Sequence, residues 1–151
     1  MVHDSSIRCL EILLVEDGLL DARITIHALR RSRVHHRVSL VRTTSEAKKF
    51  LHREGIFARA PRPDLLLLDL HLPDGDGTEV LQTMRERPAD GGPSASVVVL
   101  TAADDTATRR RCEALTIDGF ITKPFDEDQF LRVIREQKRL MVFGAPTLAG
   151  A

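Results

Sequence analysis

The sequence predicts an α/β protein built on a doubly wound parallel sheet of five strands with five helices. First, five short apolar runs alternate with stretches of helical periodicity, as in parallel strands joined by helices on both faces of a sheet. Second, Pro and Gly interrupt the chain at 60–63 and 88–93, and both loops are too short to link separate domains. Third, 151 residues suit one domain with one compact core.

The apolar runs have the length expected of strands. The third run is apolar throughout, which indicates a strand buried on both faces, whereas the fifth is the least hydrophobic and is expected at a sheet edge. In chain order the predicted strands are Ile12–Val15, Val38–Val41, Leu65–Leu68, Val97–Leu100 and Gly119–Thr122.

Capping residues and apolar periodicity predict the helices. Asp21 can cap the first helix, and the spacing of a capping box is present in Thr43-x-x-Glu46 and in Asp126-x-x-Gln129. The predicted helices run from Asp21 toward Leu29, from Thr43 to a stop at Gly55, from Gly77 to before Pro88, from Thr106 to Leu115, and onward from Asp126.

Composition argues against several classes of function. Lys plus Arg and Asp plus Glu both total 22, so no net field favours nucleic acid or an anionic membrane. No apolar run approaches the roughly 20 residues needed to span a bilayer, and the N-terminus lacks the regions of a signal peptide, so a cytoplasmic location is expected. Cys9 and Cys112 form no Cys-x-x-Cys pair, which argues against a zinc or redox motif.

Polar side chains follow four of the five predicted strands. The carboxyl ends of parallel strands open onto one crevice, so three carboxylates, a hydroxyl and an ammonium are expected to share one site. They are Glu16 and Asp17 after the first strand, Asp69 after the third, Thr101 after the fourth and Lys123 after the fifth.

The chemistry of this set is that of phosphoryl transfer to a carboxylate. Three clustered carboxylates repel one another unless a cation lies between them, and oxygen ligands suit Mg²⁺, for which Mn²⁺ is expected to substitute. Asp69 is the predicted nucleophile because it ends the most buried strand, whereas Glu16 and Asp17 are better placed to hold the metal. Lys123 would neutralise the phosphoryl oxygens and Thr101 would donate a hydrogen bond.

Each of these residues also has a simpler interpretation. The acidic pair could be a solvated turn, Asp69 a helix cap, and Thr101 a turn residue. Lys123 could be an ordinary strand exit. The joint placement of these residues at the strand ends favours the site. Phe120, within the fifth predicted strand, is by default a core aromatic.

These residues resemble the response-regulator receiver domain of two-component signalling, from about Glu11 to Arg139. The family has a flavodoxin-like fold with strand order 2-1-3-4-5. The matching motifs are the acidic pair Glu16-Asp17, the phosphoacceptor Asp69, the hydroxyl Thr101, the loop Leu72-Pro73 with Asp76-Gly77, and Lys123-Pro124, where the peptide bond is usually cis.

The resemblance implies roles for the matching positions. Asp17, Asp69 and the backbone carbonyl of His71 would bind Mg²⁺ directly, with Glu16 acting largely through water. The backbone groups implied to bind the phosphoryl group are those of Leu70, His71 and Ala102.

The resemblance also implies a switch made of Thr101 and Phe120. Thr101 would move toward the phosphoryl group and Phe120 would turn into the space it leaves. His71 and Ala103 lie where side chains screen the acyl phosphate from water, and many relatives have Asn at the first position, so the lifetime of the phosphoryl group does not follow from the resemblance.

A finer resemblance concerns the pathway. The segments 50–55 and 60–64 are similar to single-domain regulators that partner phytochrome-type sensor histidine kinases. This implies such a kinase as partner, with a downstream phosphotransfer protein as a further one.

The expected organisation is an N-terminal extension over 1–9, a receiver over 10–143 and a flexible tail over 144–151. Only 28 residues follow Lys123, too few for an output domain, so output through protein contacts is expected, without direct binding to nucleic acid or membrane. The apolar run after the last helix predicts a homodimer interface, or alternatively folds back on its own domain; it comprises Leu140, Met141, Val142 and Phe143.

Other functions fit less well. An aspartyl-phosphate phosphatase would carry an acid-base Asp at position 71, which is His71 here. A flavin-binding module would stack its ring on aromatics, yet the chain has no Trp or Tyr. A phosphorylation-independent, receiver-like interaction module would lack the acceptor or the lysine. The sequence therefore favours a phosphoacceptor signalling domain over an enzyme.

Overall fold

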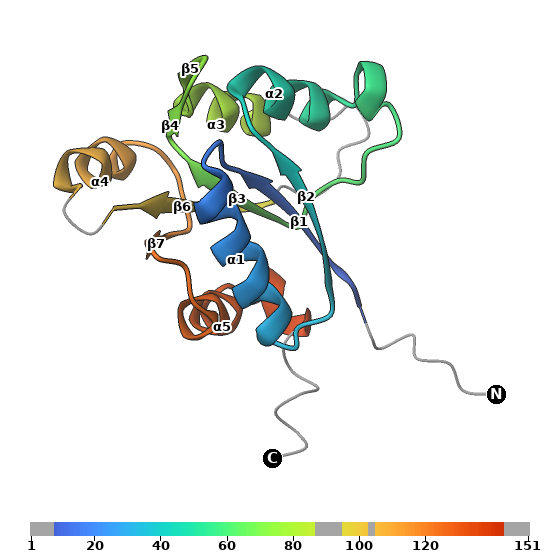
Figure 1. The fold of residues 1–151 in the computed structure, drawn as a ribbon, viewed down its shortest axis with the longest axis vertical. Helices are drawn as coiled ribbons and strands as arrows, with labels where there is room; N and C mark the ends of the chain where they lie inside the picture. The colour runs from blue at the N-terminus through green and yellow to red at the C-terminus, as the bar shows by residue number, and fades with distance from the viewer. Residues whose placement is uncertain (1–7, 87–94, 103–104, 144–151) are drawn as a thin grey trace.

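The computed structural model describes residues 8–86, 95–102 and 105–143 and has a five-stranded parallel sheet in the order β2-β1-β3-β6-β7 (Figure 1). The strands of this sheet are β1 Leu10–Val15, β2 His36–Val41, β3 Leu65–Asp69, β6 Ser96–Thr101 and β7 Gly119–Thr122. Two short strands, β4 His71–Leu72 and β5 Gly75–Asp76, form a separate antiparallel hairpin. Numbered without this hairpin, the order is 2-1-3-4-5, which confirms the predicted fold and the edge position of the fifth strand.

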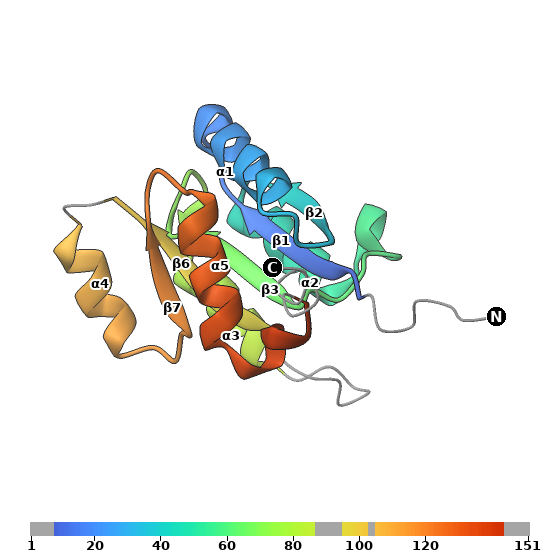
Figure 2. The ribbon, with the colours of Figure 1, turned by 90° about the horizontal axis from the view of Figure 1, so that it is seen from below.

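The helices lie on both faces of the sheet, so the fold is doubly wound. Helices α1 and α5 cover one face, and α2 and α3 cover the other (Figure 2). The α-helices are α1 Leu19–Arg31, α2 Thr44–His52, α3 Thr78–Arg85, α4 Thr106–Glu113 and α5 Glu127–Glu136; the 3₁₀ turns are Gly55–Phe57 and Lys138–Leu140.

The sheet divides the apolar core into two clusters because side chains alternate along each strand. In β1, Ile12 and Leu14 pack toward α1 and α5, whereas Leu13 and Val15 pack toward α2 and α3. Every residue of β3 is buried, as predicted for a strand covered on both faces. The strands are thereby held rigidly, and the site lies at their carboxyl ends.

Two of the predicted helix caps are confirmed, and one is wrong. The hydroxyl of Thr43 accepts a hydrogen bond from the backbone N–H of Glu46 (3.0 Å), and Asp126 accepts from the N–H of Gln129 (2.8 Å). Asp21 does not cap the first helix: Gly18 is the N-cap, and Asp21 lies inside the first turn.

The predicted stop of α2 at Gly55 is also wrong by a few residues. The helix ends at His52, and Arg53 adopts the left-handed conformation (φ 59°) that glycine usually takes at this position. Gly55 instead begins a 3₁₀ turn.

Two of the four residues in the C-terminal apolar run are buried within the domain. Helix α5 ends at Glu136, and extended backbone at Gln137 separates it from the next turn. Leu140 and Phe143 then fold back into the core cluster beneath α1 and α5. The burial of these two side chains contradicts their assignment to a dimer interface and favours the fold-back alternative for them.

Met141 and Val142 remain about half exposed (50% and 46%). The predicted tail over 144–151 and most of the predicted extension over 1–9 lie outside the described residues, as does Ala103. Within the described ranges, no helix combines the length and apolar character required to cross a bilayer.

Candidate functional site

The sheet brings the predicted site residues together at one edge. Glu16 and Asp17 directly follow β1, and Asp69 is the last residue of β3. Thr101 ends β6, and Lys123 comes directly after β7, where its backbone N–H donates to the carbonyl of Thr101 (2.7 Å). Parallel strands in register place these ends side by side, so the predicted convergence is present in the structure.

The ammonium of Lys123 is the centre of the site. Its Nζ lies 2.8 Å from Oε1 of Glu16 and 3.0 Å from Oδ2 of Asp69. A third carboxylate, Asp21, places its Oδ2 3.1 Å from the same nitrogen. The ammonium has three N–H donors, which equals the number of carboxylates around it.

Sequence reasoning missed Asp21 as a site residue. Its position in the first turn of a helix gave it a simpler interpretation as a cap, and nothing in the local sequence links it to a lysine 102 residues away. The contact is visible only in the folded chain, where Nζ of Lys123 reaches Oδ2 of Asp21.

Burial and proximity change the protonation of these groups. Burial raises the pKa of Glu16 from 4.5 to about 7, although the nearby ammonium of Lys123 opposes the rise. Burial alone would lower the pKa of Lys123, but its contacts with Glu16 and Asp69 outweigh that effect and raise the pKa. Lys123 is therefore charged throughout the physiological range.

The carboxylates fit a divalent cation. One oxygen from each of Glu16, Asp17 and Asp69 lies within 4.8 Å of the others. Such oxygen donors suit Mg²⁺ and Mn²⁺, and the cation would offset the repulsion among the three charges. Divalent metal binding is thus the property that this donor set supports.

The backbone after Asp69 is shaped to approach the acceptor closely. The N–H of His71 donates to Oδ1 of Asp69 (2.8 Å), so both carboxylate oxygens are held in place. A Cβ added to Gly77 would lie 2.8 Å from Cα of Leu70, which explains the glycine. Of the predicted phosphoryl-binding groups, Leu70 and His71 follow the acceptor and Ala102 follows Thr101, at the same edge of the sheet.

The β4–β5 hairpin is fixed to α2 on one side. The two carboxylate oxygens of Asp74 accept from the backbone N–H groups of Thr44 (2.7 Å) and Ser45 (2.9 Å) at the start of this helix. The hydrogen bonds to Ser45 and Thr44 lower the pKa of Asp74, although slight burial opposes the effect.

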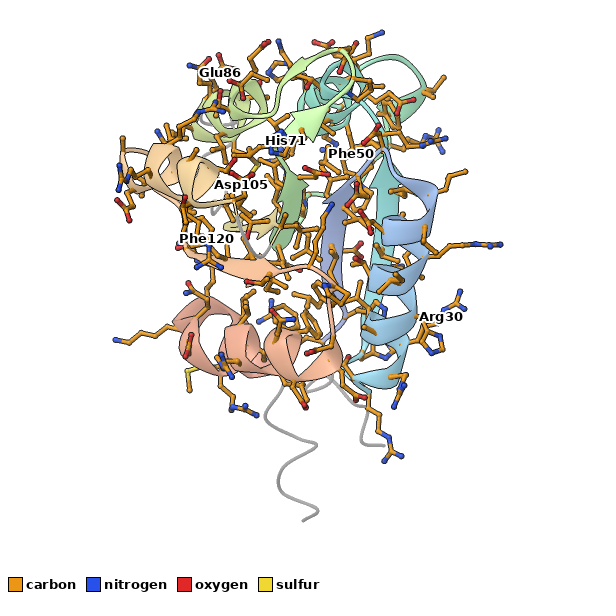
Figure 3. All side chains as sticks on the ribbon, turned by 60° about the vertical axis from the view of Figure 1, so that its left-hand side comes forward. Arg30, Phe50, His71, Glu86, Asp105 and Phe120 are labelled. Atoms are coloured by element: carbon orange, nitrogen blue, oxygen red, sulfur yellow. The ribbon has the colours of Figure 1, made fainter. Side chains whose placement is uncertain are left out.

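On its other side the hairpin contacts α4. Nε2 of His71 lies 2.9 Å from Oδ2 of Asp105, the N-cap of α4, and these residues lie near each other in Figure 3. Hydrogen bonds from Thr108 and then from His71 lower the pKa of Asp105 to about 2. Asp76 forms an ion pair with Arg111 of the same helix.

The predicted switch residues lie on neighbouring strands. The hydroxyl of Thr101 is buried, and no hydrogen-bond partner for it is found among the described residues. The ring of Phe120 is partly buried, with the guanidinium carbon of Arg109 5.5 Å from its centroid. The peptide bond between Lys123 and Pro124 is cis, as the resemblance implied.

The fold and this arrangement define a phosphoacceptor signalling domain, and comparison with known proteins identifies its family. The sequence matches the response regulator receiver domain over residues 12–135, and the chain belongs to that family.

Within this family, the chain is similar to several individual response regulators. The chain is 36% identical over 112 residues to the response regulator Rcp1 of Synechocystis sp., covering 74% of this chain and 75% of Rcp1. The structure of Mn²⁺-bound Rcp1 is similar with a TM-score of 0.67 at 35% identity, covering 82% of this chain and 88% of that one. The bacteriophytochrome response regulator AtBRR gives a TM-score of 0.73 at 33% identity, over 90% of this chain and 95% of AtBRR.

Proposed function

We propose that this receiver domain accepts a phosphoryl group on Asp69 in a reaction that requires Mg²⁺, and that it signals through protein contacts. One observation carries the proposal: the Asp69 carboxylate contacts the ammonium of Lys123 (3.0 Å) and belongs to the acidic cluster with Glu16 and Asp17. A carboxylate that contacts a fixed cation and belongs to a metal-binding cluster is suited to attack an anionic phosphoryl group.

The residues of the chain would perform the transfer as follows. A carboxylate oxygen of Asp69 bonds to the phosphorus of a phosphohistidine, the P–N bond breaks, and its electron pair stays on the departing imidazole. One N–H of Lys123, which donates to Asp69 before the reaction, then donates to a phosphoryl oxygen. The Thr101 hydroxyl donates to another phosphoryl oxygen. Bound Mg²⁺ would be held by Asp17, Asp69 and the carbonyl of His71, and would neutralise charge on the phosphoryl oxygens.

Labelling with acetyl phosphate tests the acceptor. Wild type with Mg²⁺ is expected to gain the mass of one phosphoryl group, and Asp69→Asn is expected to gain none. The control is Glu136→Gln, which changes an exposed acidic side chain at the end of α5. Equal labelling of wild type and Asp69→Asn would contradict the proposed acceptor.

The proposed phosphodonor is a phytochrome-type sensor histidine kinase. The support is that AtBRR, whose structure matches 90% of this chain, is named a bacteriophytochrome response regulator. Leu19 and Leu20 are exposed (58% and 71%) at the start of α1, just before Asp21. Apolar side chains this close to the acceptor suit docking of a partner helix. This partnership is consistent with the expected cytoplasmic location and with transfer to a downstream phosphotransfer protein.

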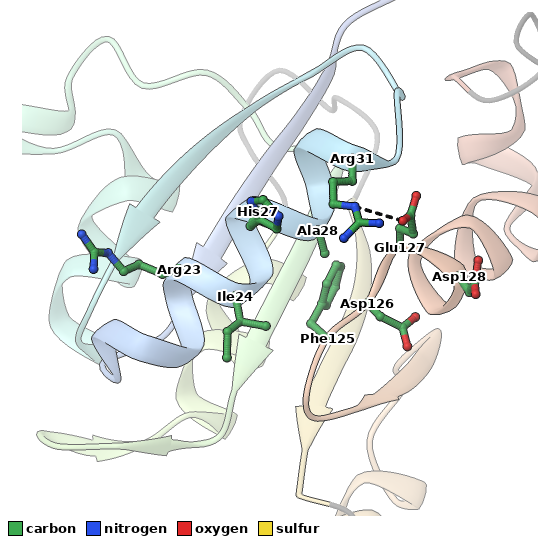
Figure 4. A pocket seen from close by; sticks show the side chains of 9 residues that line it. All are labelled: Arg23, Ile24, His27, Ala28, Arg31, Phe125, Asp126, Glu127 and Asp128. Atoms are coloured by element: carbon green, nitrogen blue, oxygen red, sulfur yellow. Dashed lines mark ion pairs between the residues drawn. The ribbon is translucent and has the colours of Figure 1, made fainter.

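A groove beside α1 extends this surface. It has a volume of about 480 Å³ and lies between α1 and the start of α5 (Figure 4). Ile24, Ala28 and Phe125 give it an apolar floor, and the ion pair between Arg31 and Glu127 (3.3 Å) closes one end. An apolar groove with charges at its rim suits the amphipathic helix of a kinase.

Comparing a kinase with acetyl phosphate as phosphodonor tests docking separately from the chemistry of transfer. Replacing both Leu19 and Leu20 by Ser is expected to slow transfer from a phytochrome-type kinase far more than labelling by acetyl phosphate. Ile56→Ser is the control, since Ile56 is the most exposed large apolar side chain described (94%) and lies on the 3₁₀ turn after α2. Equal losses with both donors would contradict docking at this position.

A homodimer remains part of the proposal, through Met141 and Val142 rather than the whole apolar run. Sedimentation of wild type should give the mass of a dimer, and the double variant Met141→Asp, Val142→Asp the mass of a monomer. Equal masses would contradict this role. The alternative of a phosphatase gains no support, because the imidazole of His71 is paired with Asp105.

A further inference from the structure

Asp21 connects α1 to the lysine of the site. Its Oδ2 lies 3.1 Å from Nζ of Lys123, although the side chain is 46% exposed and belongs to a helix that contributes no other ion pair to this lysine. We propose that Asp21 is a positioning residue for Lys123 in the phosphorylation of Asp69. This inference rests on the proposed function.

The geometry around the ammonium explains the role. Lys123 has three N–H donors, and it donates hydrogen bonds to Asp69 (3.0 Å) and Asp21 (3.1 Å). Oε1 of Glu16 lies 2.8 Å from the same nitrogen as an ion-pair partner without hydrogen-bond geometry. When a phosphoryl group joins Asp69, the donor on that side must turn to a phosphoryl oxygen. The other two contacts then hold the ammonium in place during the transfer.

Without Asp21, Glu16 alone would hold the ammonium against the pull of the phosphoryl group. Glu16 is almost fully buried (1% exposed), whereas Lys123 is 21% exposed and reaches the site from the end of β7. A four-carbon side chain held at one point can occupy several rotamers, and each nonproductive rotamer lowers the fraction of chains ready to react. A second contact from α1 restricts the ammonium from the solvent side.

A purely structural role for Asp21 makes a different prediction. An acidic residue in the first turn stabilises a helix by about 0.3–1 kcal/mol through the helix dipole. Asp21 is not the cap of α1, because Gly18 is the N-cap and Asp21 lies inside the first turn. A structural role would therefore change the stability of the domain and leave the rate of phosphorylation unchanged.

The test compares initial rates of labelling by saturating acetyl phosphate with Mg²⁺, followed by intact mass. Asp21→Ala is expected to react about tenfold more slowly than wild type, and Asp21→Asn by less, because its amide oxygen still accepts a hydrogen bond. Glu136→Gln, which neutralises an exposed acidic side chain at the end of α5, should react like wild type.

A double variant tests whether Asp21 acts through its contact with Lys123. In Lys123→Ala, which reacts slowly by itself, the added change Asp21→Ala should have no further effect, because the group that Asp21 holds is gone. A wild-type rate in Asp21→Ala overturns the inference, and so does an undiminished tenfold loss in the Lys123→Ala background. Persistent labelling of Asp69→Asn would instead overturn the proposed function and this inference with it.

Discussion

Replacing Glu16 by Gln should remove a pH-dependent loss of stability from the metal-free protein. Glu16 has a folded-state pKa of about 7 against an ordinary value of 4.5, because burial disfavours its charged form. Between these two values the folded protein holds a proton that the unfolded chain has released. Stability contributed by the protonated form is present below pH 4.5 and is lost as the pH rises through 7.

The size of the effect follows from the two pKa values. Each step of one in pKa is worth about 1.4 kcal/mol, so the change from 4.5 to about 7 corresponds to a loss of about 3 kcal/mol by pH 8. Glu16→Gln cannot ionise at this position and should escape that loss. All other titrating groups are common to the two proteins, so the difference between them reports Glu16 together with its interactions with Asp69 and Lys123.

Urea unfolding followed by circular dichroism measures the difference. With EDTA present, the free energy of unfolding of wild type relative to Glu16→Gln should fall by about 3 kcal/mol between pH 4.5 and pH 8. Saturating Mg²⁺ should reduce this fall, because the cation offsets the carboxylate charge. Glu113→Gln, at the exposed end of α4, serves as the control. An identical pH dependence in wild type and Glu16→Gln would refute the reasoning.

Three further predictions concern the metal and the framework of the site. Mg²⁺ at 100 times its dissociation constant should stabilise the wild type by about 2.7 kcal/mol, seen as a rise in Tm that Asp17→Asn reduces. Leu67→Ala, in the middle of the fully buried β3, should lower the free energy of unfolding by about 2–5 kcal/mol in urea. Gly77→Ala should lower the melting temperature and slow labelling by acetyl phosphate, since the new Cβ would meet the Cα of Leu70 at 2.8 Å; an unchanged rate and Tm would show that the loop accommodates it.

Much of the fold can be predicted from the sequence because buried parallel strands consist of apolar runs. The run Leu65–Leu68 identified β3 within one residue, and Gly119–Thr122 gave the bounds of β7 without error. β2 was predicted two residues too short, because His36 and Arg37 are polar residues on an edge strand that is only partly covered. Because parallel strands end at one edge of the sheet, topology alone predicted that the acidic pair, Asp69, Thr101 and Lys123 lie together.

The features that sequence reasoning missed depend on contacts between distant segments. Asp21 resembles a cap, and its contact with Lys123 joins residues that lie 102 positions apart in the sequence. The break at Gln137 carries neither Pro nor Gly, so no local signal favoured the fold-back alternative, which places Leu140 in the core, over the predicted dimer interface. The left-handed conformation of Arg53 was also missed, because a non-glycine residue does not predict that conformation.

The hairpin that follows Asp69 has a mechanical consequence. Asp74 fixes it to the start of α2, while His71 and Asp76 fix it to α4 through Asp105 and Arg111. The segment is therefore a short rigid spacer between two helices that are distant in sequence, with the reactive aspartate at its base. A displacement of this spacer must strain or release a contact at one helix or the other, so the surroundings of Asp69 and the positions of both helices are mechanically linked.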